Sequence, residues 1–241
     1  MVARIMIEER YSGPPSAGNG GYVSGMIAEH LGAGPVTVTL MRPTPLGQSL
    51  IVRDAGEDAI MLMDGEEVLV TAERAFSDPE TITPPAVADV ARAMPPRDYA
   101  EAHLYPGCFV CGPHRHDGDG MCIFPGVMGP GLMGAVWTPP AEFGDGEGRV
   151  RTEFIWSALD CPGSFAAFSG VPPRPMVLGR LTISVHDRPP VGEDLMVLGW
   201  SITHEGRRHE VGTGLYDRNG RCLAVGQATW IELKTEARAA A

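Results

Sequence analysis

The sequence lacks the signals of export and of membrane insertion. Its first ten residues hold no long apolar run before their charges, and no stretch approaches the roughly 18 apolar residues of a membrane span. Its cysteines number five, an odd and unevenly spaced set that does not make the disulfide framework of a small secreted domain. We therefore expect a soluble cytoplasmic protein with reduced thiols.

Positive charge is also scarce. The 19 Lys and Arg residues against 30 Asp and Glu residues give a net charge of -11 and a pI near 5.0. Such a charge repels nucleic acids and acidic lipid surfaces, so we expect neither as a partner. The sequence also contains no glycine-rich phosphate loop, no Ser-His-Asp elbow and no HExxH helix.

Two parts of the chain carry the same pattern, which indicates an internal duplication. Residues 36–40 align with residues 181–185 at an offset of 145, and the same offset carries 45–52 onto 190–197. Each copy has a strand, a Pro/Gly turn, a second strand and then an Asp-Gly or Asn-Gly hairpin dipeptide. Beyond that dipeptide the offset grows to 155 and 154, which predicts a longer central hairpin in the second copy.

One helix is predicted before each set of strands. In the first copy it covers 20–31, with Asn19 as a natural N-cap and Gly32 as a natural stop. In the second it begins at Asp160 or Cys161 and runs to about Phe168, because proline is best tolerated in a first helical turn.

The expected strands alternate apolar and polar residues or are bounded by turn residues. In the first copy they are 5–10, 36–41, 50–55, 59–63 and 67–76; in the second they are 121–124, 132–137, 176–186, 194–203, 208–216 and 221–233. Residues 77–107, rich in Pro, Ala and Asp, are expected to link the units, with a short helix at 86–93. This division places the first unit at 1–76 and the second at 108–236.

A strand, a helix and a long antiparallel meander is the element order of the hotdog fold. Two copies predict an α+β double hotdog, in which one long antiparallel sheet wraps around two central helices. Gly18-Asn19-Gly20-Gly21-Tyr22 resembles the motif that opens the central helix of phenylacetate-type hotdog thioesterases. The sequence from Trp156 to Gly163 resembles the start of the helix in the second half of type II acyl-CoA thioesterases, where an aspartate stands.

The resemblance implies an acyl-CoA thioesterase-like hydrolase and a set of catalytic residues. Thioester hydrolysis needs donors for the carbonyl oxygen and a base or carboxylate nucleophile, and a glycine-rich helix N-terminus supplies free N–H groups. The implied catalytic residues are Asp160, Asn19, Gly20, Gly21 and Gly163. Asp160 would be the acid, base or nucleophile, or would only cap its helix; Asn19 would orient water or polarise the carbonyl, or would only be an N-cap.

Substrate binding is assigned to one aromatic and two basic side chains. These are Tyr22, Arg151 and Arg180. Arginines of the second half would receive coenzyme A phosphates, and the candidates are Arg149, Arg151, Arg174, Arg180, Arg207 and Arg208.

The sequence departs from both families. Phenylacetate-type enzymes carry an aspartate about two turns into the helix, where this chain has Ala28 followed by Glu29. Type II enzymes pair their aspartate with a Thr and a Gln on later strands. Gln227 lies near the expected place, but strand alternation turns it to the opposite face, and Thr182 is only a loose match.

A cysteine and histidine cluster is open to three interpretations. Cys108 and Cys111 form a Cys-x2-Cys pair, and a zinc site could be completed by His114 and Cys122. A redox disulfide between Cys108 and Cys111 is a second possibility. We favour the third, a plain turn with packed thiols, and expect no metal or other cofactor.

We therefore predict cleavage of a thioester of a small or medium acyl group, carried by coenzyme A or another thiol. Two alternatives stay open: a non-catalytic acyl-CoA-binding module, and a hydratase or dehydratase using His30 and His186. A homodimer is expected, because open sheet edges invite pairing.

Overall fold

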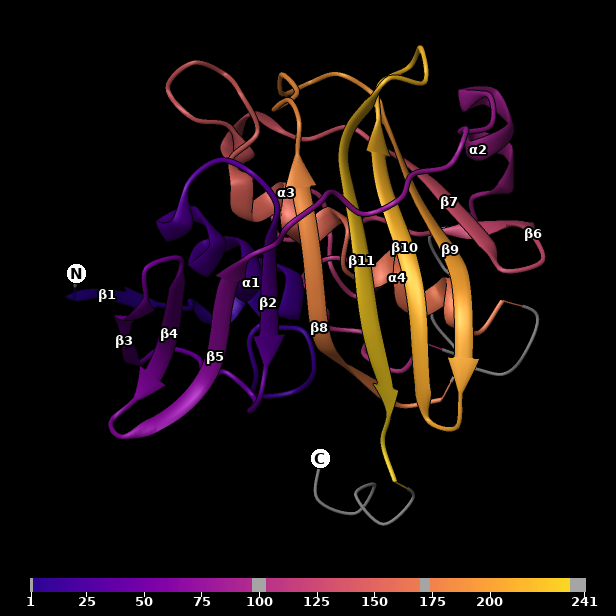
Figure 1. The fold of residues 1–241 in the computed structure, drawn as a ribbon. Helices are drawn as coiled ribbons and strands as arrows, with labels where there is room; N and C mark the ends of the chain where they lie inside the picture. The colour runs from indigo at the N-terminus through magenta and orange to yellow at the C-terminus, as the bar shows by residue number, and fades with distance from the viewer. Residues whose placement is uncertain (1, 97–102, 170–173, 235–241) are drawn as a thin grey trace.

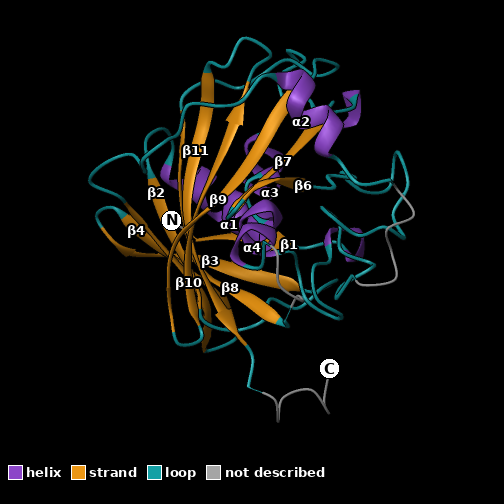
Figure 2. Ribbon diagram, turned by 90° about the vertical axis from the view of Figure 1, so that its right-hand side faces the viewer, coloured by secondary structure: helices purple, strands orange, loops and turns teal. Residues whose placement is uncertain are grey.

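A computed structural model describes residues 2–96, 103–169 and 174–234. In these residues one antiparallel sheet of 11 strands runs through both halves of the chain, in the order β1-β3-β4-β5-β2-β8-β11-β10-β9-β7-β6 (Figure 1). The helices α1, α3 and α4 lie on one face of this curved sheet (Figure 2). The predicted double hotdog is confirmed.

The first half contains one helix and five strands. They are β1 (Val2–Met6), α1 (Gly20–Ala28), β2 (Val36–Leu40), β3 (Ser49–Gly56), β4 (Ala59–Asp64) and β5 (Glu67–Arg74). Short 3-10 helices occupy Glu9–Tyr11 and Glu29–Leu31, and α2 (Val87–Ala93) confirms the short helix expected between the two copies.

The second half repeats the order of strand, helix and four-strand meander, and its four meander strands are longer than those of the first half. Its elements are β6 (Gly126–Gly129), β7 (Leu132–Trp137), α3 (Thr152–Ala158), α4 (Cys161–Ala167), β8 (Met176–Val185), β9 (Leu195–Glu205), β10 (Arg208–Tyr216) and β11 (Cys222–Glu232). A 3-10 turn at Ala141–Phe143 precedes α3. Strands β9 and β10 have 11 and 9 residues against 8 and 6 in β3 and β4, so the longer second hairpin is confirmed.

The two copies meet where their equivalent strands β2 and β8 pair. Thr37 lies opposite Thr182. On either side of this pair, Val36 lies opposite Ile183 and Val38 lies opposite Leu181. Because Thr37 and Thr182 are related by the same 145-residue offset, an approximate two-fold axis of the duplication passes between them. Their hydroxyl oxygens are 2.8 Å apart.

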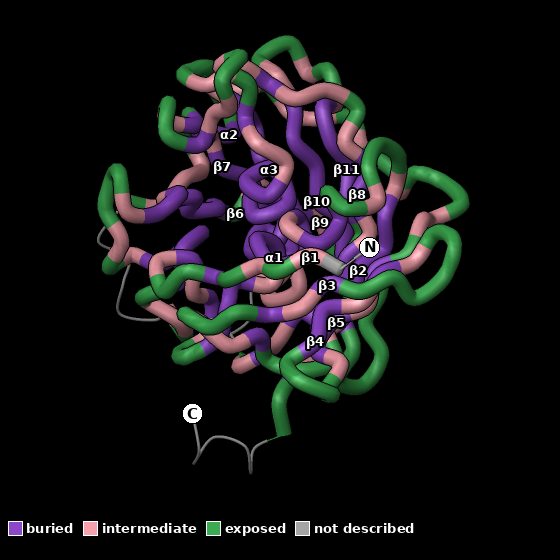
Figure 3. The backbone as a smooth tube through the Cα atoms, turned by 90° about the vertical axis from the view of Figure 1, so that its left-hand side faces the viewer, coloured by how far each residue is buried: buried purple, intermediate pink, exposed green. Residues whose placement is uncertain are grey.

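The two copies also meet where α1 crosses α3 inside the sheet, and both helices are largely buried (Figure 3). Gly21 and Gly25 lie one helical turn apart at this crossing. A Cβ on Gly25 would lie 2.5 Å from the Cα of Glu153, and one on Gly21 would lie 2.6 Å from the Cβ of Asp160. Because neither glycine has a side chain, the backbones of α1 and α3 can approach each other closely, and the start of α1 comes next to Asp160.

The structure differs from the predicted elements in four places, one of which is the unpredicted strand β6. The strand expected at 5–10 ends at Met6, and the chain then turns, with the Tyr11 amide donating to the Glu8 carbonyl. The strand expected at 121–124 is absent, because Cys122 has a positive φ of 53° and the amides on either side donate to the loop at Phe109 and Val110. The apolar run before Asp160, which was not assigned its own element, forms α3. The unit boundaries at 76 and 108 stay predictions.

Candidate functional site

Asp160 lies in a break between two helices. Pro162 has no N–H and its ring would clash with the preceding helical turn, so α3 ends at Ala158 and α4 begins at Cys161. The predicted start of the second helix is confirmed. The side chain of Asp160 makes no capping hydrogen bond to α4. Its carboxylate is consequently available for other contacts.

These contacts come from the other copy of the duplication. Oδ2 of Asp160 accepts hydrogen bonds from Nδ2 of Asn19 and from the amide of Gly21, both at 2.9 Å. Asn19 also caps α1, because its Oδ1 accepts from the amide of Tyr22 at 2.9 Å. The predicted N-cap is therefore confirmed, and Asn19 also binds the carboxylate at the start of the other helix; a role toward water or a substrate carbonyl stays a prediction.

Only one oxygen of Asp160 is used in this way. The residue is 2% exposed, and its Oδ1 has no hydrogen-bond partner among the described residues. Burial raises the pKa of Asp160 to about 7; the Gly21 amide opposes this shift and the nearby Cys108 adds to it. A carboxyl group with such a pKa can both accept and release a proton near neutral pH.

Three cysteines lie beside this carboxylate. The Sγ atoms of Cys108 and Cys161 are 3.7 Å apart, and all three sulfur atoms of Cys108, Cys111 and Cys161 lie within 4.8 Å of one another. Nδ2 of Asn19 is 3.9 Å from Cys108 Sγ. Hydrogen bonding from Cys111 and then Cys161 holds the pKa of Cys108 well below its usual value, and the pKa values of the two donors are raised.

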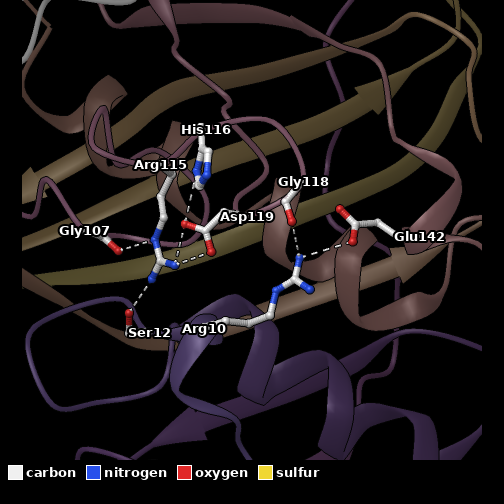
Figure 4. Close-up of polar contacts among 8 residues, drawn as sticks. All are labelled: Arg10, Ser12, Gly107, Arg115, His116, Gly118, Asp119 and Glu142. Carbon is white, nitrogen blue, oxygen red and sulfur yellow. Dashed lines mark hydrogen bonds and ion pairs between the residues drawn. The ribbon is translucent and has the colours of Figure 1, made fainter.

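The loop that carries Cys108 and Cys111 is anchored by two arginines (Figure 4). Arg115 donates to the carbonyl of Gly107, to both carboxylate oxygens of Asp119 and to the hydroxyl of Ser12. Arg10 donates to the carbonyl of Gly118 and pairs with Glu142 at 3.5 Å. The loop is therefore tied both to itself and to the turn that precedes α1.

A cavity of about 670 Å³ opens next to these residues. Its polar end contains Asn19, Gly20, Cys108, Cys111, Asp160 and Cys161. Its apolar wall includes Met133, Phe165, Phe168, Met176, Leu178 and Trp230. Both copies thus contribute to a single cavity with one chemically active end.

Two N–H groups of residues that line the cavity have no acceptor among the described residues. The amide of Gly20, the first residue of α1, takes part in no hydrogen bond there, as expected at a helix N-terminus. The indole Nε1 of Trp230 is buried and unpartnered. Gly20 lines the cavity, whereas the indole Nε1 of Trp230 lies beside Gly163, where an added Cβ would be 3.3 Å from it.

Two arginines complete the cavity lining. Arg42 pairs with Glu67 at 2.9 Å, and Arg174 pairs with Glu232 at 3.2 Å. A neighbouring hollow of about 710 Å³ shares part of the lining, including Tyr105, but contains no basic side chain. Arg42 and Arg174 are therefore the positively charged guanidinium groups of this lining, each next to a glutamate.

The predicted substrate-binding side chains lie elsewhere. Tyr22 stacks on Tyr11 at 4.0 Å within a buried aromatic group. Arg151 pairs with Glu153 and lies 4.7 Å from the Phe154 ring, and Arg180 pairs with Glu73. None of the three is part of the cavity lining. Their role in binding stays a prediction that this geometry does not favour.

The other candidates also lie outside the cavity lining. Gly163 packs against β10, where an added Cβ would lie 2.7 Å from Val211, and its amide donates to the Asp160 carbonyl. His114 is exposed and Cys122 lies outside the sulfur cluster. Gln227 is exposed, as strand alternation predicted, and Thr182 bonds Thr37 at the seam between copies.

Sequence reasoning missed three features of the site. Cys161 was considered only as a helix start, and its meeting with Cys108 joins segments 53 residues apart. Trp230 was noted only as part of the repeat. Arg42 was not considered, although Arg174 was among the candidate phosphate ligands. The alternation of inward and outward residues along β11 could have indicated that the Trp230 side chain faces the cavity. The contact between Cys108 and Cys161 has no local signal in the sequence.

The fold is shared with several solved structures. A protein of Novosphingobium aromaticivorans described as a candidate thioesterase matches with a TM-score of 0.65 at 12% identity, covering 97% of this chain and 96% of that one. An acyl-CoA thioesterase II of Mycobacterium marinum matches with a TM-score of 0.59 at 10% identity, covering 98% and 94%. A hotdog-fold protein of unknown function from Alicyclobacillus acidocaldarius matches with a TM-score of 0.55 at 14% identity, covering 97% and 93%.

These likenesses establish a double-hotdog protein whose architecture resembles that of type II acyl-CoA thioesterases. No protein-family model matches the sequence, and no curated protein sequence matches it significantly. Among the described residues, no helix is both long and apolar enough to cross a bilayer.

Proposed function

We propose that this protein is a thioesterase that hydrolyses the thioester of a small or medium acyl group, with acyl-CoA as its substrate class. The observation that carries the proposal is the carboxylate of Asp160. It is buried at the polar end of an apolar cavity, one oxygen is held by Asn19 and Gly21, and the other oxygen has no partner in the part of the chain that the structure describes. A carboxylate that only capped a helix would not be arranged in this way.

The cavity suits the three parts of an acyl-CoA. Its apolar wall accommodates the acyl chain, and its polar end receives the thioester carbonyl. Arg42 and Arg174 lie where the phosphates of the coenzyme would be attracted, since a guanidinium binds phosphate oxygens in pairs. Arg174 was among the arginines that the sequence offered for this role, and Arg42 is added to them.

Hydrolysis would then proceed with Asp160 as general base. Its unpartnered Oδ1 accepts a proton from water as the water oxygen attacks the thioester carbon. The carbonyl oxygen becomes negatively charged, and the amide of Gly20, a residue of the cavity lining, can donate to it. The C–S bond then breaks, and Asp160 returns the proton to the departing thiolate.

The two histidines that the sequence offered for a dehydratase lie away from the cavity. His30 is exposed on the 3-10 turn after α1, and His186 pairs with Asp78 at 3.0 Å. Neither side chain lines the cavity. Homodimerisation, a cytoplasmic location and the absence of a cofactor remain predictions from the sequence.

The test is a screen of short-, medium- and aryl-acyl-CoA with wild type and Asp160→Asn. Loss of substrate is followed by chromatography, because five protein cysteines would interfere with a thiol reagent. Asn at 160 keeps an oxygen to accept from Asn19 and Gly21 but cannot act as a base. We expect its kcat/KM to fall at least about 100-fold.

The matched control is Glu29→Gln, which removes the carboxylate next to the position used by phenylacetate-type enzymes. Glu29 is exposed, so its activity should stay within about 2-fold of wild type. If wild type binds acyl-CoA but cleaves none, the protein is a binding module. If Asp160→Asn cleaves as fast as wild type, Asp160 is not the base.

A further inference from the structure

We propose that Cys108, Cys111 and Cys161 bind one zinc ion, with the fourth coordination position facing the cavity and filled by water or a ligand molecule. The sequence interpretation of a zinc site had used Cys108, Cys111, His114 and Cys122. The structure keeps the first two of these residues and replaces the others with Cys161, from the start of α4.

The sulfur separations fit a tetrahedral zinc site. With Zn–S bonds of about 2.3 Å, tetrahedral geometry places neighbouring sulfur atoms about 3.8 Å apart. Cys108 and Cys161 are 3.7 Å apart, and every pair in the cluster is within 4.8 Å. The sulfur separations are therefore close to those that a bound zinc ion requires.

The cluster has the chemistry and burial of a metal site. Thiolate ligands select thiophilic ions such as zinc. All three cysteines are at most 5% exposed, yet all three line the cavity, so an ion could reach them from it. The amide of Asn19 near Cys108 supplies the kind of outer hydrogen bond that orients metal ligands.

The segments that hold the cysteines are fixed independently of any ion. Arg115 and Arg10 anchor the loop, the Gly112 amide donates to the Cys108 carbonyl at 2.9 Å, and Phe109 donates to Ser12 at 2.7 Å. Cys161 is held by the break before Pro162. Such preorganisation lowers the cost of collecting three ligands from segments distant in sequence.

Three protein ligands and one open position are typical of a zinc ion that can bind an exchangeable molecule. The ion would lie at the same end of the cavity as Asp160 and would connect the cysteine loop to α4. The proposal does not depend on thioester hydrolysis, because its evidence is the sulfur geometry alone.

The test is the zinc content of the full chain, purified under reducing conditions and equilibrated with zinc before gel filtration. We expect about one zinc per chain in wild type and below about 0.2 in Cys108→Ala and Cys161→Ala. His114→Ala and Cys122→Ala, which remove the ligands of the earlier interpretation, should keep the ion. Asp160→Asn should also keep it, so failure of the proposed function leaves this result unaffected.

Two further measurements guard against misfolded variants. Cobalt substituted into wild type should give a near-ultraviolet sulfur-to-metal band with the intensity of three thiolates. Zinc should raise the Tm of chelator-treated wild type and Cys122→Ala but not of Cys161→Ala. The proposal is overturned if reduced wild type takes up no zinc, if Cys161→Ala retains it, or if the cobalt band indicates fewer than three thiolates.

Discussion

Asp160 is removed from water when α4 packs against the sheet, and the two donors that reach it come from the other half of the chain. The pKa of Asp160 is raised because two hydrogen bonds to one of its oxygens do not replace the water that would solvate an exposed carboxylate. A residue whose ionised form is disfavoured in the folded state costs stability at neutral pH, which is a frequent property of functional groups.

The stability of Asp160→Asn should depend on pH in a defined direction. The folded pKa is about 7 and the unfolded pKa about 4, so folding favours the protonated form. Wild type therefore loses stability as pH rises from about 4 to about 7, and the neutral amide does not. In chelator-treated protein, the free energy of unfolding of Asp160→Asn relative to wild type should rise between pH 5 and pH 8, by at most about 3 kcal/mol. An equal difference at both pH values, measured by urea unfolding, would show that Asp160 does not titrate in this range.

Substrate binding can be tested at Arg174, with Arg180 as the matched control. Both are partly exposed and both pair with a glutamate, but only Arg174 lines the cavity. We expect Arg174→Ala to raise the KM for acyl-CoA about 5- to 10-fold, with the effect shrinking at high salt, and Arg180→Ala to leave it unchanged. A larger effect at Arg180 would move the nucleotide site to the outer face of the sheet.

At the scale of elements, the crossing of α1 and α3 brings the site together. Gly21 and Gly25 let the backbones touch, and Gly21 then donates its amide directly to Asp160. Pro162 separates α3 from α4 and leaves Asp160 free of a capping role. Three local features, two small residues and one proline, thus place a carboxylate between two helices.

Gly25→Ala should separate these helices. The added Cβ would lie 2.5 Å from the Cα of Glu153, and backbone atoms cannot move aside as a flexible side chain can. We expect a loss of about 1–3 kcal/mol in the free energy of unfolding. Gly129→Ala, where an added Cβ has open space, should stay within about 1 kcal/mol of wild type. Equal stabilities by urea unfolding would mean that the crossing is loosely packed.

At the scale of the whole molecule, the duplication joins two units into one sheet across β2 and β8. The approximate two-fold axis passes Thr37 and Thr182, whose hydroxyl groups share a hydrogen bond. The scaffold is repeated, but the helix starts differ: Asn19 and glycines in one copy, Asp160, Cys161 and Pro162 in the other. Because the copies face each other at α1 and α3, the two different starts combine into one asymmetric site.

A double-mutant cycle can measure this seam. Thr37→Val or Thr182→Val alone leaves one hydroxyl without its partner, whereas the double variant removes both. We expect a coupling of about 0.5–1.5 kcal/mol between the two substitutions in urea unfolding. Thr37→Val with Thr203→Val, on β9 three strands away from β8, should be additive. An additive Thr37/Thr182 cycle would mean that the hydrogen bond does not contribute to joining the units.

Local patterns were sufficient for most of the fold. Strand alternation and turn dipeptides located β2 to β5 and β7 to β11 to within a few residues, since each depends on nearby residues. Residues 121–124 were mistaken for a strand because their apolar character serves packing beneath the cysteine loop. The left-handed backbone at Cys122 could not be read from residue type.

The sequence by itself determined the duplication, the two helix starts and the chemical residue types at each start. Only the tertiary structure decided that Asn19, Asp160 and three cysteines converge on one cavity, while Tyr22, Arg151 and Arg180 lie outside it. The physical reason is that helix starts and strand periods depend on local sterics and burial. The contact between Asn19 and Asp160, 141 positions apart, depends on how closely two helices can cross, and the contact between Cys108 and Cys161, 53 positions apart, depends on where the cysteine loop packs.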